Sequence, residues 1–215
     1  MTDFAAARRH MVDGQVRTAD VTDHRIISAL QKVPRENFVP AEARELAYLD
    51  FAMKVGGGRT LLKPVVLARL IHAAELELTD RVLVVGCATG YSAAILALVA
   101  GQVVALEEDD TLATVAKAAL AGQPNVTVAN GPLTAGWAEG DLYDAILIDG
   151  AVEVVPDAFR RQLKDGGKLV CVLGVPPNAT AMLYRRSGDE LGGRSIFDAA
   201  ATVLPGFAKT PVFAF

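Results

Sequence analysis

The feature that most constrains this chain is a regular alternation, from about Thr79 onward, of short apolar runs and alanine-rich stretches. Each apolar run is rich in Val, Ile and Leu and has the length of a β-strand, whereas the stretches between them have helical length. This order predicts a parallel sheet with crossover helices, because parallel strands need long connections. The predicted strands are residues 81–86, 102–107, 125–130, 143–149 and 167–174.

The connections complete the predicted fold. Residues 91–100, 109–121 and 156–163 are expected to be helices, and Asp109 and Pro156 are typical helix-start residues. After Gly174 two β-rich runs flank residues 189–193, which predicts a hairpin loop and an antiparallel edge. We therefore expect a Rossmann-like α/β fold whose mostly parallel seven-stranded sheet ends in an antiparallel C-terminal hairpin.

The first 78 residues have a different pattern. Apolar positions recur at helical spacing over residues 21–33 and 65–77, around a middle region that Gly and Pro interrupt. We expect residues 1–78 to form a helical lid with a loop, packed on a core of residues 79–215, and we expect His10 to lie in a mobile start.

The composition excludes a wholly disordered chain, because 52% of the residues are hydrophobic and only 21% are charged. A net charge of −4 gives no general field that attracts nucleic acid. Cys87 and Cys171 lie in apolar segments and predict free thiols in a reducing cytoplasm. No apolar run predicts a signal peptide or a membrane span, and the histidines lack partners at metal-ligand spacing. No pattern indicates the oligomeric state.

The most informative motif is VLVVGCATGY, residues 82–91, in which a buried strand leads through a glycine-punctuated turn into a helix. Glycine tolerates positive φ and close approach of a ligand, and the helix start presents unpaired N–H groups. Glu107 ends the next strand 21 residues beyond Gly86, which is the spacing at which an acid meets ribose hydroxyls. Each element alone also fits an ordinary turn or a solvated acid. Together they predict nucleoside binding.

Glycine spacing separates two kinds of nucleoside cofactor. A dinucleotide motif needs glycines at its first, third and sixth places, which are here Gly86, Ala88 and Tyr91. Tyr91 would crowd a pyrophosphate, whereas S-adenosylmethionine has no phosphate. The methyltransferase pattern uses the first, third and fifth places, where Gly86 and Gly90 match and Ala88 is a small replacement. We therefore expect S-adenosylmethionine as the cofactor.

Several segments resemble the protein-L-isoaspartate O-methyltransferase family, over nearly the whole chain. MVDGQVR, VPRENFVP and AYLD are similar to its helical lid, GGGRTLLKPVVLARL to its substrate loop, and GPLTAGW, YDAILIDGA and LKDGGKLVCVLG to its later motifs. The resemblance implies a class I methyltransferase fold. It also implies methyl transfer from S-adenosylmethionine to the free carboxylate of isoaspartyl residues in damaged proteins or peptides, a repair reaction of the cytosol.

The resemblance also implies the site, although it assigns no catalytic residue. Arg59 and Lys63 flank Leu62 in the substrate loop and are expected to face an anionic substrate, although a solvated pair of cations fits the same pattern. The implied cofactor contacts are Thr60, Leu61, Gly86, Cys87, Ala88, Gly90, Glu107, Glu108, Gly131, Pro132 and Leu133.

Three departures from the family pattern fall on contact points. Leu62 replaces a serine that would donate to the substrate, and Val84 replaces an acid that helps to hold the methionine part of the cofactor. The loop of residues 131–133 replaces Gly-Asp-Gly and so lacks the acid beside the adenine. A charge-assisted hydrogen bond is worth about 1.5–3 kcal/mol, so losing two weakens cofactor affinity by about a hundredfold or more.

The expected mechanism depends on positioning, because an isoaspartyl carboxyl is ionised near neutral pH and needs little acid-base help. A loop of residues 54–64 is expected to position the substrate and exclude water. Asp149 ends a strand at the face where ligands bind in open α/β sheets. It fits a base for a hydroxyl or amine substrate, and it equally fits a cap of the following turn.

Two other functions remain open at this point. The first is a non-catalytic or specificity-shifted relative that keeps the fold for a binding or assembly role, which Leu62, Val84 and Pro132 together suggest. The second is an enzyme of the same fold that methylates a small molecule or RNA, although the acidic balance of the chain argues against RNA.

Overall fold

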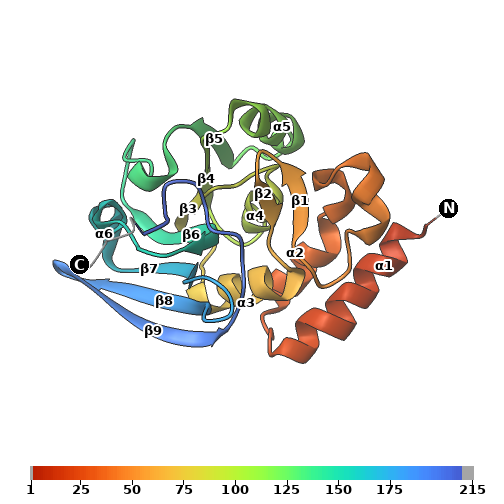
Figure 1. Ribbon diagram of the computed structural model, residues 1–215, viewed down its shortest axis with the longest axis horizontal. Coiled ribbons are helices and arrows are strands. Elements are labelled where there is room, and N and C mark those ends of the chain that lie inside the picture. The colour runs from red at the N-terminus through yellow and green to blue at the C-terminus, as the bar shows by residue number, and fades with distance from the viewer. Residues whose placement is uncertain (1, 210–215) are drawn as a thin grey trace, which may run out of the picture.

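The computed structural model describes residues 2–209 and contains the predicted seven-stranded sheet (Figure 1). Its strands pair in parallel as far as β7, and β8 and β9 complete an antiparallel edge. The predicted fold class is therefore confirmed. In spatial order the strands are β5 (Val126–Asn130), β4 (Gln102–Glu107), β3 (Arg81–Val85), β6 (Tyr143–Val152), β7 (Leu163–Leu173), β8 (Thr180–Ser187) and β9 (Glu190–Asp198).

Crossover helices join the parallel strands as expected, with α4 shorter than predicted. The side chain of Asp109 accepts hydrogen bonds from the N–H groups of Thr111 and Leu112, which caps α5. The predicted loop at residues 189–193 is too long, because β9 begins at Glu190 and pairs with β8 directly after a tight turn at Gly188. The helices are α3 (Pro64–Ala74), α4 (Tyr91–Leu96), α5 (Asp110–Leu120) and α6 (Asp157–Gln162).

The sheet is buried on both faces, and alternate residues of each central strand enter different layers. Val84 and Leu147 belong to the layer under α3, α4 and the N-terminal segment. Val85 and Ile148 belong to the layer under α6, where Phe159 stacks on Phe207. This alternation explains why the strands read as nearly continuous apolar runs.

The N-terminal segment contains short helices and one hairpin. His10 lies in α1 rather than in a mobile start, because the Asp3 side chain caps that helix and Met11 is buried at its end. A hairpin of β1 and β2 stands where only a loop was expected, and Gly57 and Gly58 both have positive φ at its tip. These elements are α1 (Phe4–Met11), η1 (Val12–Val16), η2 (Arg17–Ala19), α2 (His24–Lys32), η3 (Arg35–Phe38), η4 (Ala41–Leu46), β1 (Met53–Gly56) and β2 (Arg59–Leu61).

One layer of buried side chains extends across the predicted boundary at residue 78. Leu30 and Ala47 from the N-terminal segment share it with Val84 and Leu147 of the sheet. The division into residues 1–78 and 79–215 stays a prediction, and residues 210–215 lie outside the described part. Within residues 2–209 no helix is long and apolar enough to cross a membrane.

The turn before β4 tests how tightly the sheet is built. A Cβ at Gly101 would lie 2.8 Å from the Leu78 carbonyl oxygen and 3.1 Å from the Thr79 carbonyl carbon, and both neighbours are backbone atoms. Gly101→Ala should lower the free energy of unfolding by about 1–3 kcal/mol, as overpacking does. Urea denaturation measures this loss.

Gly122→Ala is the matched control, because a Cβ there meets no atom of residues 2–209 within 4 Å. Its effect should stay within about 0.5 kcal/mol, which is usual for surface substitutions. Equal stabilities for the two variants would contradict the packing around Gly101.

Candidate cofactor site

The turn after β3 has the backbone conformation that its glycines predict. Gly86 and Gly90 have φ of +79° and +98°, and Ala88 has φ of +49°. A side chain at Gly90 would also meet Leu120 Cδ1 at 2.9 Å, so the glycine allows α4 to pack closely on α5. Two N–H groups, of Gly86 and Cys87, donate to the Leu106 carbonyl, and these bonds attach the turn to β4.

Glu107, at the end of β4, faces this turn. One carboxylate oxygen, Oε2, accepts a hydrogen bond of 2.7 Å from the Ala88 N–H. The other, Oε1, accepts from the N–H groups of Glu108 at 3.0 Å and Asp109 at 3.2 Å. The side chain is completely buried. The acid and the glycine turn that the sequence singled out therefore lie together.

Arg59 fills the space between the turn and the acid. Its Nη1 lies 2.7 Å from Glu107 Oε1, and its Nη2 donates to the Gly86 carbonyl at 2.7 Å. Only 3% of the Arg59 side chain is exposed. A Cβ at Gly86 would lie 2.4 Å from Nη2, so the guanidinium occupies the room that the glycine leaves.

Leu204 also contacts this turn. It belongs to residues 199–209, which follow β9 and are called the C-terminal segment here. Its Cδ1 would lie 3.0 Å from a Cβ at Gly86, and its Cδ2 would lie 2.5 Å from a Cβ at Gly150. The segment is attached to β6 by hydrogen bonds from the Ala151 N–H to Thr202 O and from the Leu204 N–H to Ala151 O. The sequence interpretation missed this contact, because no local pattern connects residue 204 with residue 86.

The predicted adenine-side residues meet next to Glu107. Leu133 is buried, and its N–H lies 3.4 Å from the carboxylate of Glu108, which is exposed. Gly131 donates its N–H to the Glu107 carbonyl, and Trp137 packs against Gly131, whose Cβ would lie 3.3 Å from the indole ring. Pro132 is exposed at the loop tip.

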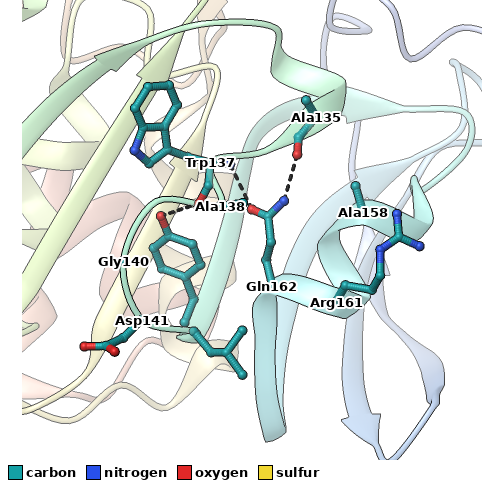
Figure 2. A pocket seen from close by; sticks show the side chains of 10 residues that line it. Ala135, Trp137, Ala138, Gly140, Asp141, Ala158, Arg161 and Gln162 are labelled. Carbon is teal, nitrogen blue, oxygen red and sulfur yellow. Dashed lines mark hydrogen bonds between the residues drawn. The ribbon is translucent and has the colours of Figure 1, made fainter.

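Figure 2 shows how Gln162 of α6 fixes the chain that follows this loop. Its side chain accepts from the Trp137 N–H at 2.8 Å and donates to the Ala135 carbonyl at 2.7 Å. The Tyr143 hydroxyl donates to the Trp137 carbonyl at 2.8 Å. These residues line the pocket in the figure, and the bonds to the Trp137 N–H and carbonyl hold its backbone in place.

The other predicted contacts are distributed unevenly. Cys87 and Leu61 are fully buried, and Leu62 is 2% exposed within the apolar layer. Thr60 is partly exposed, and its hydroxyl donates to the Thr202 hydroxyl at 3.1 Å, which ties the β1–β2 hairpin to the C-terminal segment. Lys63 is partly exposed at the start of α3.

A second polar cluster is buried beneath the turn. Ser92 of α4 donates to Asp149 Oδ2 at 2.5 Å. Arg35 donates to the carbonyls of Ala47 and Leu62, and its guanidinium lies 4.7 Å from the Tyr91 ring centre. The Arg35 Nη1, the Tyr91 hydroxyl and Asp149 Oδ1 are buried and have no hydrogen-bond partner among the residues that the structure describes. The sequence offered no sign of this cluster beyond Asp149.

Burial dominates the ionisation of this cluster. It raises the pKa of Asp149 to about 6, against the Ser92 hydrogen bond and the nearby Arg59 and Arg35 charges, which lower it. Burial also lowers the pKa of the Arg35 guanidinium. Asp149 is thus a carboxyl that changes its charge near neutral pH.

Taken together, the sheet, the glycine turn and the facing acid define a class I methyltransferase of Rossmann-like fold. The model of the protein-L-isoaspartate(D-aspartate) O-methyltransferase family matches residues 6–200, so the chain belongs to this family of S-adenosylmethionine-dependent enzymes. Protein-L-isoaspartate O-methyltransferase 1 of Rhodopseudomonas palustris is 38% identical over 201 residues, which cover 92% of this chain and 82% of the relative.

Solved structures agree with the family and the fold. One protein-L-isoaspartate O-methyltransferase has a TM-score of 0.80 and 25% identity, and the match covers 93% of this chain and 66% of that chain. A Plasmodium falciparum structure, described as a protein of the same kind in complex with S-adenosyl-L-homocysteine, has a TM-score of 0.75. At 16% identity it supports the fold alone, and it covers 95% of this chain and 99% of that chain.

The residue types at the turn suit the adenosine part of S-adenosylmethionine. Glycines allow close approach to the backbone, and Glu107 provides a buried carboxylate to accept bonds from ribose hydroxyls. The Arg59 guanidinium and the Leu204 methyl groups, however, occupy the surroundings of Gly86 in this conformation. The turn thus combines open backbone and a buried acceptor with two side chains that fill the space beside Gly86.

The raised pKa of Asp149 makes stability depend on pH. A folded-state pKa of about 6, above the unfolded value of 3.8, lets the folded protein keep a proton that the unfolded chain has lost. Stability should therefore fall as pH rises from about 4 to about 6 and stay lower above that range. Asp149→Asn removes this titration. Between pH 4.5 and 7.5 the wild type should lose on the order of 2 kcal/mol more than Asp149→Asn.

Urea denaturation across this pH range measures the difference. Asp50→Asn, at an exposed carboxyl, is the matched control and should follow the wild-type profile. If the profiles of Asp149→Asn and wild type ran parallel, Asp149 would not be buried as described.

The position of Leu62 yields a stability prediction. Leu62→Ser would leave a cavity and bury a hydroxyl, so it should lower the free energy of unfolding by about 3 kcal/mol. Leu62→Met keeps the volume and should cost less than about 1.5 kcal/mol. Thermal unfolding distinguishes the two variants, and a serine variant as stable as wild type would place Leu62 outside the core.

Proposed function

We propose that the chain transfers a methyl group from S-adenosylmethionine to the free carboxylate of isoaspartyl residues in proteins and peptides. The single observation that carries this proposal is the buried Glu107 carboxylate, which faces the glycine turn of β3 in a chain of this family. The predicted non-catalytic alternative has no support in the comparisons.

The cofactor contacts that we propose lie on both sides of Glu107. The Glu107 carboxylate would accept from the ribose hydroxyls, with the Cys87–Ala88 backbone and Gly90 beneath them. Glu108 and the loop of Gly131, Pro132 and Leu133 would border the adenine, where the pairing of Glu107 with Asn130 brings the ends of β4 and β5 together. Thr60 and Leu61 would contribute from the hairpin.

When bound, S-adenosylmethionine would supply an activated methyl group on its sulfonium sulfur, for transfer to an oxygen of the substrate carboxylate with S-adenosylhomocysteine as the leaving group. The protein's part is positioning and removal of water. The hairpin and the C-terminal segment, joined by Thr60 and Thr202, lie over the turn and would exclude water once they had rearranged around the bound cofactor. The acceptor carboxylate is already ionised at neutral pH, so the chain needs no general base for it.

A surface groove beside the hairpin tip is the proposed path for the peptide. It is lined by Phe38 and Pro40 of the N-terminal segment, Gly57 of the hairpin, and Thr89 and Asp109 of the two ligand-facing turns. Its volume is about 360 Å³, which is larger than a single side chain. The groove thus runs along the tip of the hairpin, at Val55, Gly56 and Gly57.

We also propose a cytoplasmic location. Cys87 and Cys171 are free and fully buried, and burial raises the pKa of both thiols. Such thiols are typical of proteins that fold under reducing conditions.

The test uses labelled S-adenosylmethionine, an isoaspartyl peptide and the aspartyl peptide of the same sequence. The wild type should form a base-labile methyl ester on the isoaspartyl peptide alone. Glu107→Gln should weaken binding of S-adenosylhomocysteine at least tenfold in calorimetry, because the ribose loses a charged acceptor. Cofactor binding without ester formation would reject the isoaspartyl substrate, and no binding to wild type would reject the whole proposal.

A further inference from the structure

Arg59 and Glu107 form an ion pair, but Glu107 has more hydrogen-bond partners outside the pair than Arg59 has. Without Arg59, the Glu107 carboxylate would keep three backbone N–H donors, from Ala88, Glu108 and Asp109. Without Glu107, the Arg59 guanidinium would keep, among residues 2–209, only the Gly86 carbonyl. A buried charge without a partner is strongly unfavourable. Of the two partners, Arg59 is therefore the one that needs a replacement when the pair separates.

Cofactor binding would separate this pair. Ribose hydroxyls and the guanidinium compete for the same carboxylate, and Arg59 Nη2 occupies the space beside Gly86. The displaced guanidinium then requires another anion in the same place. An isoaspartyl substrate brings one, since its carboxylate must reach the turn to accept the methyl group.

We propose that Arg59 is the substrate-recognition residue of this chain, which exchanges Glu107 for the substrate carboxylate when the cofactor binds. This inference rests on the proposed function. A guanidinium fits a carboxylate through two parallel hydrogen bonds, which selects a planar anion over a neutral group. In the absence of cofactor, the same side chain holds the site closed.

The neighbouring side chains leave this role to Arg59. Leu62, at the position where the family resemblance implies a substrate hydroxyl, is buried in the apolar layer. Arg35 is fully buried and donates to the carbonyls of Ala47 and Leu62. Arg59 itself contacts both the glycine turn and the acid.

The exchange predicts opposite effects on cofactor and substrate. Arg59→Gln removes the competitor for Glu107, so S-adenosylhomocysteine should bind at least fivefold more tightly in calorimetry. The same variant loses two charge-assisted bonds to the substrate, so kcat/KM for an isoaspartyl peptide should fall about a hundredfold, mainly through KM. Arg59→Lys keeps a cation, so its KM should lie between those of Arg59→Gln and wild type.

Lys117→Gln is the control, because it removes an exposed cation of α5 that lies outside the substrate loop and the proposed groove. Both its affinity for S-adenosylhomocysteine and its KM should stay within threefold of wild type. Weaker cofactor binding by Arg59→Gln would overturn the proposal, since Arg59 would then support the cofactor. An unchanged KM in a folded Arg59→Gln protein would overturn it as well.

A measurement on the wild type keeps the test independent of variant folding. Because the peptide would take up the displaced guanidinium, a saturating isoaspartyl peptide should tighten S-adenosylhomocysteine binding at least fivefold, and the aspartyl peptide should not. Absence of this coupling would refute the exchange even if methyl esters form. Absence of any cofactor binding would instead reject the proposed function.

Discussion

The carboxylate of Glu107 is the interaction on which the site depends. It accepts from the turn after β3, from the start of the α5 segment and from Arg59 of the hairpin, so three separate stretches of chain converge on two oxygen atoms. A fully buried carboxylate is tolerated only with such a set of donors. The same donors hold Glu107 toward the glycine turn, where a ribose would meet it.

The parts of this arrangement that follow local rules could be predicted from the sequence. Apolar runs between helical stretches predicted the order of strands, and the spacing from Gly86 to Glu107 predicted that they would meet. The burial of Arg59 could not be predicted, because an arginine in a loop is usually exposed to solvent. It is buried here because the segment forms a hairpin that directs the side chain toward the turn. Leu204 lay equally beyond prediction, since its contact depends on a segment distant in sequence.

The buried cluster around Asp149 lies close to Val84, where the family pattern has an acid and this chain does not. Val84 pairs with Leu147 in the parallel register, and Asp149, two residues beyond Leu147, points to the same face of the sheet. The neighbouring strand thus carries a carboxylate on the face where β3 has an apolar residue. Burial raises the pKa of this Asp149 carboxyl. Among the described residues, Asp149 Oδ1 and Arg35 Nη1 also have no hydrogen-bond partner, so the polar groups of this buried region are not fully satisfied.

The β-bridge between Ala151 and Val203 has a consequence for folding during synthesis. During synthesis the glycine turn and Glu107 emerge well before residue 204, so the turn stays without its Leu204 contact until that residue has also emerged. The contact between Leu204 and Gly86 is one of high sequence separation, and such contacts form slowly.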